Sequence, residues 1–305
     1  MSTISIDPKE LLQPALHNYL LTAIAPRPIC FASTVDEHGN VNLSPFSYFN
    51  MFSTNPPIMI FSPTRRGRDN TTKHTWDNVQ KVPEVVINVV NYPIVEQMSL
   101  ASTEYEQGIN EFIKAGLTEG KSVKVKPPRV VESPVSFECK VTEIKSLGEG
   151  PGAGNLVFAE VVYIHVREDY LDENQNLDTG KLDLVARMGG SWYCRAIPEA
   201  LFQIPKPIHA KGIGVDRLPD SAKDSWVLTG NNLGRLGNFP HWPEQHVVLE
   251  LRKSEKVMQI LHDNRTNAQT CIDQLHQLAQ QLLLDHKTEQ ALAVVVLADQ
   301  VLKGG

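Results

Sequence analysis

The chain has 305 residues, of which 41% are hydrophobic and 21% are charged, so it can bury a sizeable core in one large or two smaller domains. Its formal net charge of −6 argues against nucleic acid as a partner, because that binding requires concentrated positive charge. The longest apolar run, residues 291–298, is far shorter than the about 20 residues that span a bilayer, so we expect no membrane segment.

The N-terminus and the cysteines indicate the cellular compartment. Residues 1–10 lack the basic and apolar regions of a secretory signal. The four cysteines are widely spaced and form no C-x-x-C pair, which is typical of reduced thiols with a structural role. These observations favour a cytoplasmic protein.

The pattern between residues 27 and 166 is mostly β. Strands are predicted at 29–35, 58–61, 85–90, 135–146 and 156–166, with hairpin-turn chemistry at 36–40 and a glycine-rich hairpin connection at 148–155. Their short spacing favours a barrel over a parallel βαβ sheet. Two helices are expected to interrupt the strands, at 71–82 and at 99–115, and Leu100, Phe112 and Ile113 of the second would face inward.

A loop of small polar and aromatic residues is predicted at 42–50, Asn-Leu-Ser-Pro-Phe-Ser-Tyr-Phe-Asn, directly before an apolar strand. A basic and hydroxyl-bearing segment, Lys-His-Thr-Trp-Asp-Asn, follows at 73–78. This order suits a planar aromatic ligand with an anionic tail. Aromatic side chains and serine hydroxyls would surround the ring, while Lys73 and Thr75 would hold a phosphate by charge and by hydrogen bond.

Both segments also have a simpler interpretation. The loop is equally well explained as a turn with buried aromatic side chains. Lys73 and Thr75 would then belong to an exposed helix start, with Thr71 or Thr72 as the N-cap. A helix start is itself a good anion site, so this interpretation is compatible with phosphate binding.

Five motifs carry a family resemblance over residues 20–195. They are Ala-Pro-Arg-Pro at 25–28, the segments 42–50, 56–62 and 73–78, and Ala-Arg-Met-Gly-Gly-Ser-Trp-Tyr at 186–193. In this order they resemble the flavin reductase-like family with the FMN-binding split barrel. The resemblance implies a six-stranded split β-barrel, a homodimer with FMN near the subunit interface, and hydride transfer from NADH or NADPH to the flavin.

The resemblance also implies the residues that contact the cofactor. Beside the ring and ribityl chain it implies Ser44, Phe46, Ser47, Tyr48, Phe49 and Ser62; at the phosphate it implies Lys73 and Thr75, with Asn78 in support. His74 replaces the aspartate of the family's Lys-Asp-Thr pattern, and it either helps to bind phosphate as a cation or points away.

Two arginines have more than one interpretation. Arg27 lies between prolines that fix its backbone, and it is either a flavin or interface contact or a surface arginine in a rigid turn. Arg187 precedes two glycines, and it would meet a flavin edge, a substrate carboxylate or a carboxylate across the dimer.

Histidines provide the main departure from the family. Many members have a histidine near the nicotinamide in the loop that corresponds to 148–155, and this chain has none between residues 148 and 163. His165 follows on a predicted strand, where a hydrogen-bonded structural histidine is expected. The spacing of His241 and His246 does not match a zinc motif, so we expect no metal site. No catalytic acid or base is expected, since hydride transfer depends on how two rings are stacked.

The composition changes after residue 197, which we take as the end of the barrel domain (1–197). Residues 197–246 are dense in glycine, proline and asparagine, so they are predicted to form turns that pack along the barrel or a neighbouring subunit. The segment 254–284 has helical periodicity, whereas 291–301 fits a helix or a strand equally well. The fold class expected is therefore mainly β with helices, an FMN-binding split barrel with a helical C-terminal extension (198–305).

Two functions agree with these features. The first is an FMN-dependent NAD(P)H oxidoreductase of the flavin reductase type, which would supply reduced flavin to a partner monooxygenase. The second is an FMN-binding or electron-transfer flavoprotein without efficient NAD(P)H turnover, which the missing loop histidine and the long C-terminal extension favour. A protein that has lost its ligand is disfavoured, because Ser47, Lys73 and Thr75 are intact.

Overall fold

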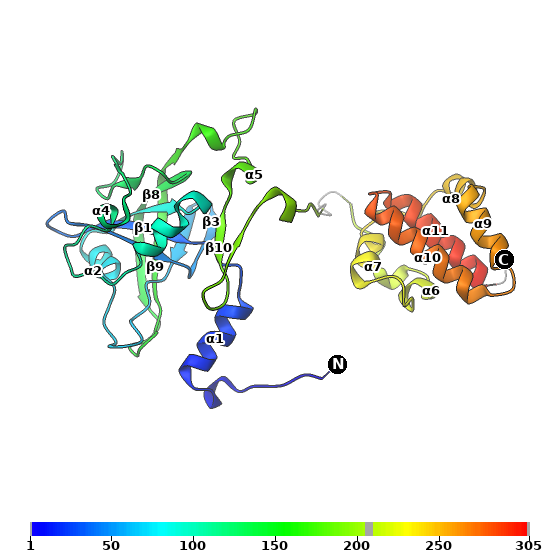
Figure 1. Cartoon of the computed structure of the whole chain (residues 1–305), viewed down its shortest axis with the longest axis horizontal. Coiled ribbons are helices and arrows are strands. Elements are labelled where there is room, and N and C mark those ends of the chain that lie inside the picture. Colours follow the sequence, from blue (N-terminus) through cyan, green and yellow to red (C-terminus); the bar gives the residue numbers. More distant parts are fainter. Residues whose placement is uncertain (1, 205–209, 304–305) are drawn as a thin grey trace. The chain divides into compact units, whose positions relative to one another are not determined.

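The computed structural model describes residues 2–204 and 210–303, and the chain divides into two compact units (Figure 1). The first unit, Met1–Phe202, contains the strands, and the second, Gln203–Gly305, is helical in the part that the structure describes. Among the described residues, no helix combines the length and the apolar character needed to cross a membrane.

One antiparallel sheet of seven strands forms the first unit (Figure 1). The strands are β1 (Cys30–Val35), β2 (Val41–Phe46), β3 (Phe49–Thr54), β4 (Pro57–Phe61), β5 (Glu84–Val89), β8 (Val135–Ser146) and β9 (Asn155–Val166). They lie in the order β2-β1-β5-β8-β9-β4-β3. Only Ser47 and Tyr48 separate the two edge strands in the chain, so the first and last strands meet at this corner and the sheet curls into a split barrel.

The predicted strands at 29–35, 58–61, 85–90, 135–146 and 156–166 are confirmed as β1, β4, β5, β8 and β9. The turn after β1 is held by Asp36, whose carboxylate accepts hydrogen bonds from the backbone N–H groups of His38 (2.9 Å) and Asn40 (2.8 Å). The glycine-rich segment closes the β8–β9 hairpin, where Leu147 N–H donates to Gly154 O at 2.9 Å.

The prediction of a loop at 42–50 is wrong, because this segment forms most of β2 and the start of β3. Its asparagine, serine and proline are poor strand formers, and they hide the strand in the sequence. Pairing with β1 over the whole of β2 decides the conformation, and Pro45 is tolerated because β2 is an edge strand. The sheet consequently has seven strands instead of the six that the resemblance implied.

Short helices and two small sheets complete the first unit. The helices are α1 (Gln13–Ala23), α2 (His74–Lys81), α3 (Val95–Leu100), α4 (Glu111–Ala115) and α5 (Thr179–Leu182), and the small sheets pair β6 (Glu119–Gly120) with β7 (Arg129–Val130) and β10 (Val185–Arg187) with β11 (Tyr193–Arg195). Helix α2 packs on β1 and β2, and α4 packs on β2. The edge strand β2 is thus covered by two helices.

The single helix predicted at 99–115 is wrong. Helix α3 ends at Leu100, and α4 begins only after Asn110, whose side chain accepts a hydrogen bond from Phe112 N–H at 2.9 Å. Between them, Gly108 has a φ of +87°, which a right-handed helix cannot contain. Phe112 is buried as predicted, whereas Leu100 (46% exposed) and Ile113 (76%) face solvent.

The barrel interior is a cluster of apolar side chains from β1, β2, β4, β5, β8, β9 and α2. Its buried members are Cys30, Ala32, Phe46, Met59, Phe61, Trp76, Val79, Val85, Ile87, Cys139, Val157 and Ala159. Cys30 and Cys139 are free thiols, and burial raises the pKa of both, so they stay protonated and act as small apolar residues.

The second unit packs its helices around α10 and α11. The helices are α6 (Asp220–Lys223), α7 (Gly230–Gly237), α8 (Gln245–Arg252), α9 (Glu255–Asp263), α10 (Ala268–Leu284) and α11 (Thr288–Leu302). The helical prediction for 254–284 is confirmed, and the undecided segment 291–301 is helical. Leu275 and Leu292 are fully buried where α10 packs on α11.

Residues 228–238 were predicted to form turns, and the structure has helix α7 there. A reciprocal capping box starts this helix: Thr229 Oγ1 accepts from Asn232 N–H (3.3 Å), and Asn232 Oδ1 accepts from Thr229 N–H (2.9 Å). Burial of Leu236 and this cap outweigh the low helix propensity of the glycines. The part of the prediction that falls on 205–209 lies outside the described residues, and packing of the extension on the barrel or a dimer stays a prediction.

Two glycines of the second unit allow a close approach of backbones. The segment before α6 joins the end of α7 through Ile213 N–H to Phe239 O and Gly214 N–H to Gly237 O, both at 2.9 Å. A Cβ on Gly212 would lie 2.3 Å from Gly237 O, and a Cβ on Gly237 would lie 2.9 Å from Val215 N. Side chains at these positions would therefore separate the two segments.

Candidate functional site

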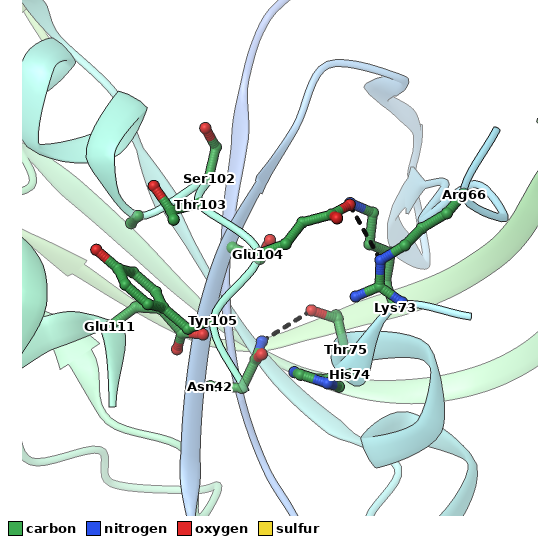
Figure 2. Close-up of a pocket in the computed structure, with 12 residues that line it drawn as sticks. Asn42, Arg66, Lys73, His74, Thr75, Ser102, Thr103, Glu104, Tyr105 and Glu111 are labelled. Carbon is green, nitrogen blue, oxygen red and sulfur yellow. Dashed lines mark hydrogen bonds and ion pairs between the residues drawn. The ribbon is translucent and has the colours of Figure 1, made fainter. Parts of the chain in front are cut away.

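A polar pocket lies where the start of α2 meets β2 and the segment between α3 and α4 (Figure 2). It is lined by Asn42, Ser44, Arg66, Lys73, His74, Thr75, Ala101, Ser102, Thr103, Glu104, Tyr105 and Glu111. Three of the residues predicted to contact the cofactor, Ser44, Lys73 and Thr75, are thus brought together. The volume is only about 20 Å³, which is room for about one water molecule.

The first turn of α2 faces this pocket without a side-chain cap. The N-cap residue is Lys73, and its side chain makes no capping hydrogen bond, so the predicted caps Thr71 and Thr72 are wrong. The first backbone N–H groups of a helix have no partner inside the helix, and the helix dipole makes this end favourable for an anion. The start of α2 therefore offers backbone donors in addition to its side chains.

The Thr75 hydroxyl is fixed by a buried network. Thr75 is 1% exposed, and its Oγ1 accepts a hydrogen bond from Asn42 Nδ2 at 2.9 Å (Figure 2). One helical turn further on, Asn78 is 6% exposed and donates to Thr34 Oγ1 of β1 at 3.1 Å. Asn78 thus anchors α2, the helix that contains Thr75, to the barrel. The predicted support of the phosphate site by Asn78 can act through this anchor, without a direct contact to Thr75.

Three cations converge on one carboxylate at the mouth of the pocket. Glu104 Oε1 lies 3.1 Å from Arg66 Nε and 3.4 Å from Lys73 Nζ, and Glu104 Oε2 lies 2.8 Å from Arg68 Nη2. Arg66 also donates to Thr71 Oγ1 at 2.9 Å and to the backbone oxygen of Thr72. This donor set, with the start of α2 and the Thr75 hydroxyl, suits a phosphate group, whose oxygens accept charge-assisted hydrogen bonds.

His74 lines the same pocket. Burial has the largest effect on the pKa of its imidazole and lowers it; the charge of Arg66 lowers the pKa further, Asp77 opposes this, and Lys73 adds a smaller lowering effect. The ring therefore favours its neutral form near neutral pH. The two roles expected for His74, a cation at the phosphate or a side chain that points away, stay predictions.

The aromatic residues of the 42–50 segment separate into two groups. The Phe46 ring packs in the barrel core, 5.6 Å between centroids from the Phe61 ring, so this residue can offer only backbone to a ligand. Ser47 and Tyr48 form the corner between β2 and β3, and Tyr48 is 41% exposed. The Tyr48 and Phe49 contacts to a flavin ring stay predictions.

Ser62 and Arg27 both hold the local structure in place. Ser62 Oγ accepts from Asn155 N–H at 3.0 Å, which ties the end of β4 to the start of β9. Arg27 is buried, with 6% of the residue exposed. Its guanidinium donates hydrogen bonds to the backbone oxygens of Leu21, Ile24 (2.6 Å) and Met188 (3.0 Å). Arg27 is therefore not a surface arginine, and its contacts join the end of α1 to Met188, the residue directly after β10.

Arg187 and His165 have identified partners within the first unit. Arg187 Nη2 donates to Gly190 O at 2.9 Å, and its guanidinium lies 4.7 Å from the centre of the Tyr193 ring. His165 Nε2 lies 2.6 Å from the fully buried Glu138, as expected for a structural strand histidine. Within the described residues, no cluster of three or more histidine, cysteine, aspartate or glutamate side chains is arranged to bind a metal.

Comparison with known proteins identifies the family of the first unit. The model of the flavin reductase like domain matches residues 22–182. A protein of Aquifex aeolicus (strain VF5) is 36% identical over 196 residues, which are 64% of this chain and 97% of that protein. The chain therefore belongs to the flavin reductase-like family, and it has the split-barrel fold.

Solved structures agree with this assignment. Component B of nitrilotriacetate monooxygenase from Bacillus cereus superposes with a TM-score of 0.61 and 26% identity, over 68% of this chain and 99% of that chain. The 2-nitrobenzoate 2-nitroreductase of Pseudomonas fluorescens has a TM-score of 0.59 and 24% identity, over 67% of this chain and 97% of that chain, and it supports the fold. The family match ends at residue 182, before the helical unit begins.

Proposed function

We propose that the first unit binds FMN and acts as an NAD(P)H oxidoreductase of the flavin reductase type. The observation that carries the proposal is the convergence of Lys73, Arg66, Thr75 and the uncapped start of α2 on one pocket. In this proposal, Lys73 and the α2 amides bind the phosphate, and Thr75 donates its hydroxyl proton to a phosphate oxygen.

The chain's part in the reaction is to hold and orient the cofactor. Bound FMN would supply the redox chemistry by accepting a hydride from NADH or NADPH. Backbone groups and side chains of the corner, Ser47, Tyr48 and Phe49, would position the ring and exclude water from it. No side chain needs to act as a catalytic acid or base.

A homodimer with FMN near the subunit interface is part of this proposal. The corner and the following edge strand expose large apolar side chains, namely Tyr48 (41%), Met51 (56%) and Phe52 (65%). Apolar side chains gathered on one exposed edge are typical of an interaction surface. The similarity to a monooxygenase component B also supports a separate monooxygenase as the partner that receives the reduced flavin.

The binding step is tested by FMN affinity in solution. Lys73→Ala and Thr75→Ala should each weaken FMN binding, because each removes a hydrogen bond to a charged group that is worth about 1.5–3 kcal/mol. Lys81→Ala is the matched control, since Lys81 lies in the last turn of α2 and contacts Glu37, away from the pocket. Unchanged FMN affinity in both pocket variants would show that the phosphate is placed wrongly.

The second candidate is an FMN-binding or electron-transfer flavoprotein with slow NAD(P)H turnover. The observation that favours it is the lack of a histidine at 148–163, where the β8–β9 hairpin would approach a nicotinamide. Steady-state oxidation of NADH and NADPH by the FMN-loaded protein separates the two candidates. Efficient turnover supports the reductase, and flavin binding with negligible turnover supports the second function.

A further inference from the structure

We infer that the Glu104 carboxylate and the FMN phosphate compete for the same three cations, so that the phosphate displaces Glu104 when FMN binds. The inference rests on the proposed function and extends the binding site to Arg66 and Arg68. It also makes Glu104 a residue that lowers the preference for phosphorylated over unphosphorylated flavin, because it competes with the phosphate alone.

The position of Glu104 is defined by cations alone. Its two carboxylate oxygens contact Arg66, Arg68 and Lys73 at 2.8–3.4 Å, and Figure 2 shows the side chain reaching toward Arg66 and Lys73. Its carboxylate has no other hydrogen-bond partner within residues 2–204 and 210–303. A carboxylate held by three cations occupies the type of environment that a phosphate requires.

The small space in the pocket favours an exchange. The pocket volume of about 20 Å³ accepts about one water molecule, and a phosphate group has five heavy atoms. Lys73 is the N-cap of α2, and the Arg66 guanidinium is also held by Thr71 and Thr72, whereas the Glu104 carboxylate has no partner besides the three cations among the described residues. Glu104 is therefore the side chain that we expect to leave.

The energetics allow this exchange. The Glu104 side chain is 38% exposed, so its ion pairs are screened by water and each is weak. A phosphate monoester carries about two negative charges and three acceptor oxygens, against one charge and two oxygens for the carboxylate. It can also accept from Thr75 and the α2 amides, which Glu104 does not contact.

The cations favour FMN over riboflavin, and competition from Glu104 reduces this preference. A flavin without a phosphate cannot replace Glu104 at the cations, so the carboxylate stays in place and the cluster contributes nothing to its binding. Removing the Glu104 charge should therefore strengthen FMN binding and leave riboflavin binding unchanged.

The test measures dissociation constants of FMN and riboflavin for the full chain, Glu104→Gln and Glu106→Gln. Glu106 is the matched control, because it is an exposed carboxylate of the same segment with no ion pair among the described residues. We expect Glu104→Gln to tighten FMN binding roughly fivefold, the effect of an exposed ion pair at the upper end of the usual range, with riboflavin unchanged. A second variant, Arg68→Gln, should weaken FMN and leave riboflavin unchanged, and the Arg68 side chain is 75% exposed, so folding is preserved.

The outcomes separate the inference from the proposed function. If the unmodified chain binds FMN but Glu104→Gln leaves its affinity unchanged or weakens it, the exchange is wrong and the proposed function stands. If Glu104→Gln tightens FMN and riboflavin equally, Glu104 acts by blocking access and the phosphate exchange is wrong. If the unmodified chain binds neither flavin, both the proposed function and the exchange are overturned.

Discussion

The interiors of the two units differ in polarity. The buried polar residues of the first unit are Arg27, Ser33, Thr34, Asn42, Ser62, Thr75, Asn78, Asn88, Asn91, Glu111, Ser133, Ser136, Glu138 and Asn155, whereas in the described part of the second unit the set contains His276 alone. The barrel interior thus contains many side chains that need hydrogen-bond partners, and the helical interior depends on apolar packing.

The buried polar residues fix the geometry of the barrel. Asn88 is an example, since it donates to Phe31 O at 3.0 Å and accepts from Val130 N–H (2.9 Å) and Ser136 Oγ (2.8 Å). One side chain thereby joins segments far apart in the chain, and any other arrangement would leave buried groups unpaired. A binding pocket benefits from such fixed geometry, whereas apolar packing in the helical unit tolerates small adjustments.

The largest expected effect comes from removing the carboxylate of Glu138, a fully buried side chain of the barrel that accepts several hydrogen bonds. Glu138 accepts from the backbone N–H groups of Val123 (2.7 Å), Lys124 (2.5 Å) and Val125 (3.1 Å), and from His165. Glu138→Ala should lower the unfolding free energy of the first unit by about 3–5 kcal/mol, because it leaves these donors unpaired. Peptide-resolved hydrogen exchange in urea measures the effect and assigns it to β8 and β9.

Glu143→Ala is the matched control for this prediction. Glu143 lies on the same strand but faces solvent, so its removal should change the stability by no more than about 0.5 kcal/mol. Equal effects of the two substitutions would remove the argument that buried polar groups fix the barrel.

An intermediate effect is expected from two glycines of one helix in the second unit. Gly237→Ala introduces a Cβ 2.9 Å from Val215 N and should destabilise the unit by about 1–3 kcal/mol. Gly234→Ala, in the same helix, meets nothing within 4 Å and should stabilise α7 by about 0.5–1 kcal/mol. Urea unfolding of the two variants checks the opposite signs, and destabilisation by both would contradict the backbone-contact explanation.

The smallest expected effect is a pH dependence of the stability of the second unit, which tests the role of His276, the buried polar residue in the described part of its core. Ser225 Oγ lies 2.9 Å from His276 Nδ1, and His276 Nε2 has no partner among the described residues. Burial lowers the pKa of His276 from its ordinary value of 6.5, with a smaller opposing effect of Asp273. Below 6.5 the unfolded chain binds the proton more readily than the folded chain, so stability is full above this pH and is lost as the pH falls toward the folded-state pKa.

The measurement compares the unfolding free energy of the second unit across the range from about pH 8 to about pH 5. His276→Gln should remove a slope of at most about 1.4 kcal/mol per pH unit. The exposed His262→Gln is the control and should retain the slope. A slope that persists in His276→Gln would assign the pH dependence to another group.

The sequence predicts those elements whose local pattern agrees with their tertiary environment. Strands β8 and β9 are long and bounded by turn residues, so their limits were predicted almost to the residue. Strand β2 and helix α7 were missed, because their residues have a low propensity for the structure that they adopt. Pairing with β1 makes β2 a strand, and a capping box together with burial of Leu236 makes α7 a helix. Such contacts come from the whole fold and leave little trace in a short window.

The site was predictable to a similar extent. Lys73 and Thr75 were predicted from the basic and hydroxyl-bearing segment 73–78 and from the family resemblance. Glu104 was missed because it lies 31 residues from Lys73 on a segment predicted to be helical, and no local pattern connects it with the cations. Asn42 was noted as part of its segment, but its bond to Thr75 depends on how α2 packs against β2.

The hydrogen bond from Asn42 to Thr75 has a consequence for recognition in concentrated salt. Because the hydrogen bond from Asn42 fills one of the two acceptor positions of Thr75 Oγ1, the hydroxyl is held in place and its O–H can donate to an acceptor oxygen such as that of a phosphate. This contact lies in a buried position, where mobile ions have little access. The long-range attraction of the exposed Arg68 and the partly buried Arg66 and Lys73 is screened as ionic strength rises, with a Debye length of about 8 Å at physiological salt. Dissolved salt would thus weaken the long-range attraction of anions while leaving the directional contact at Thr75 in place.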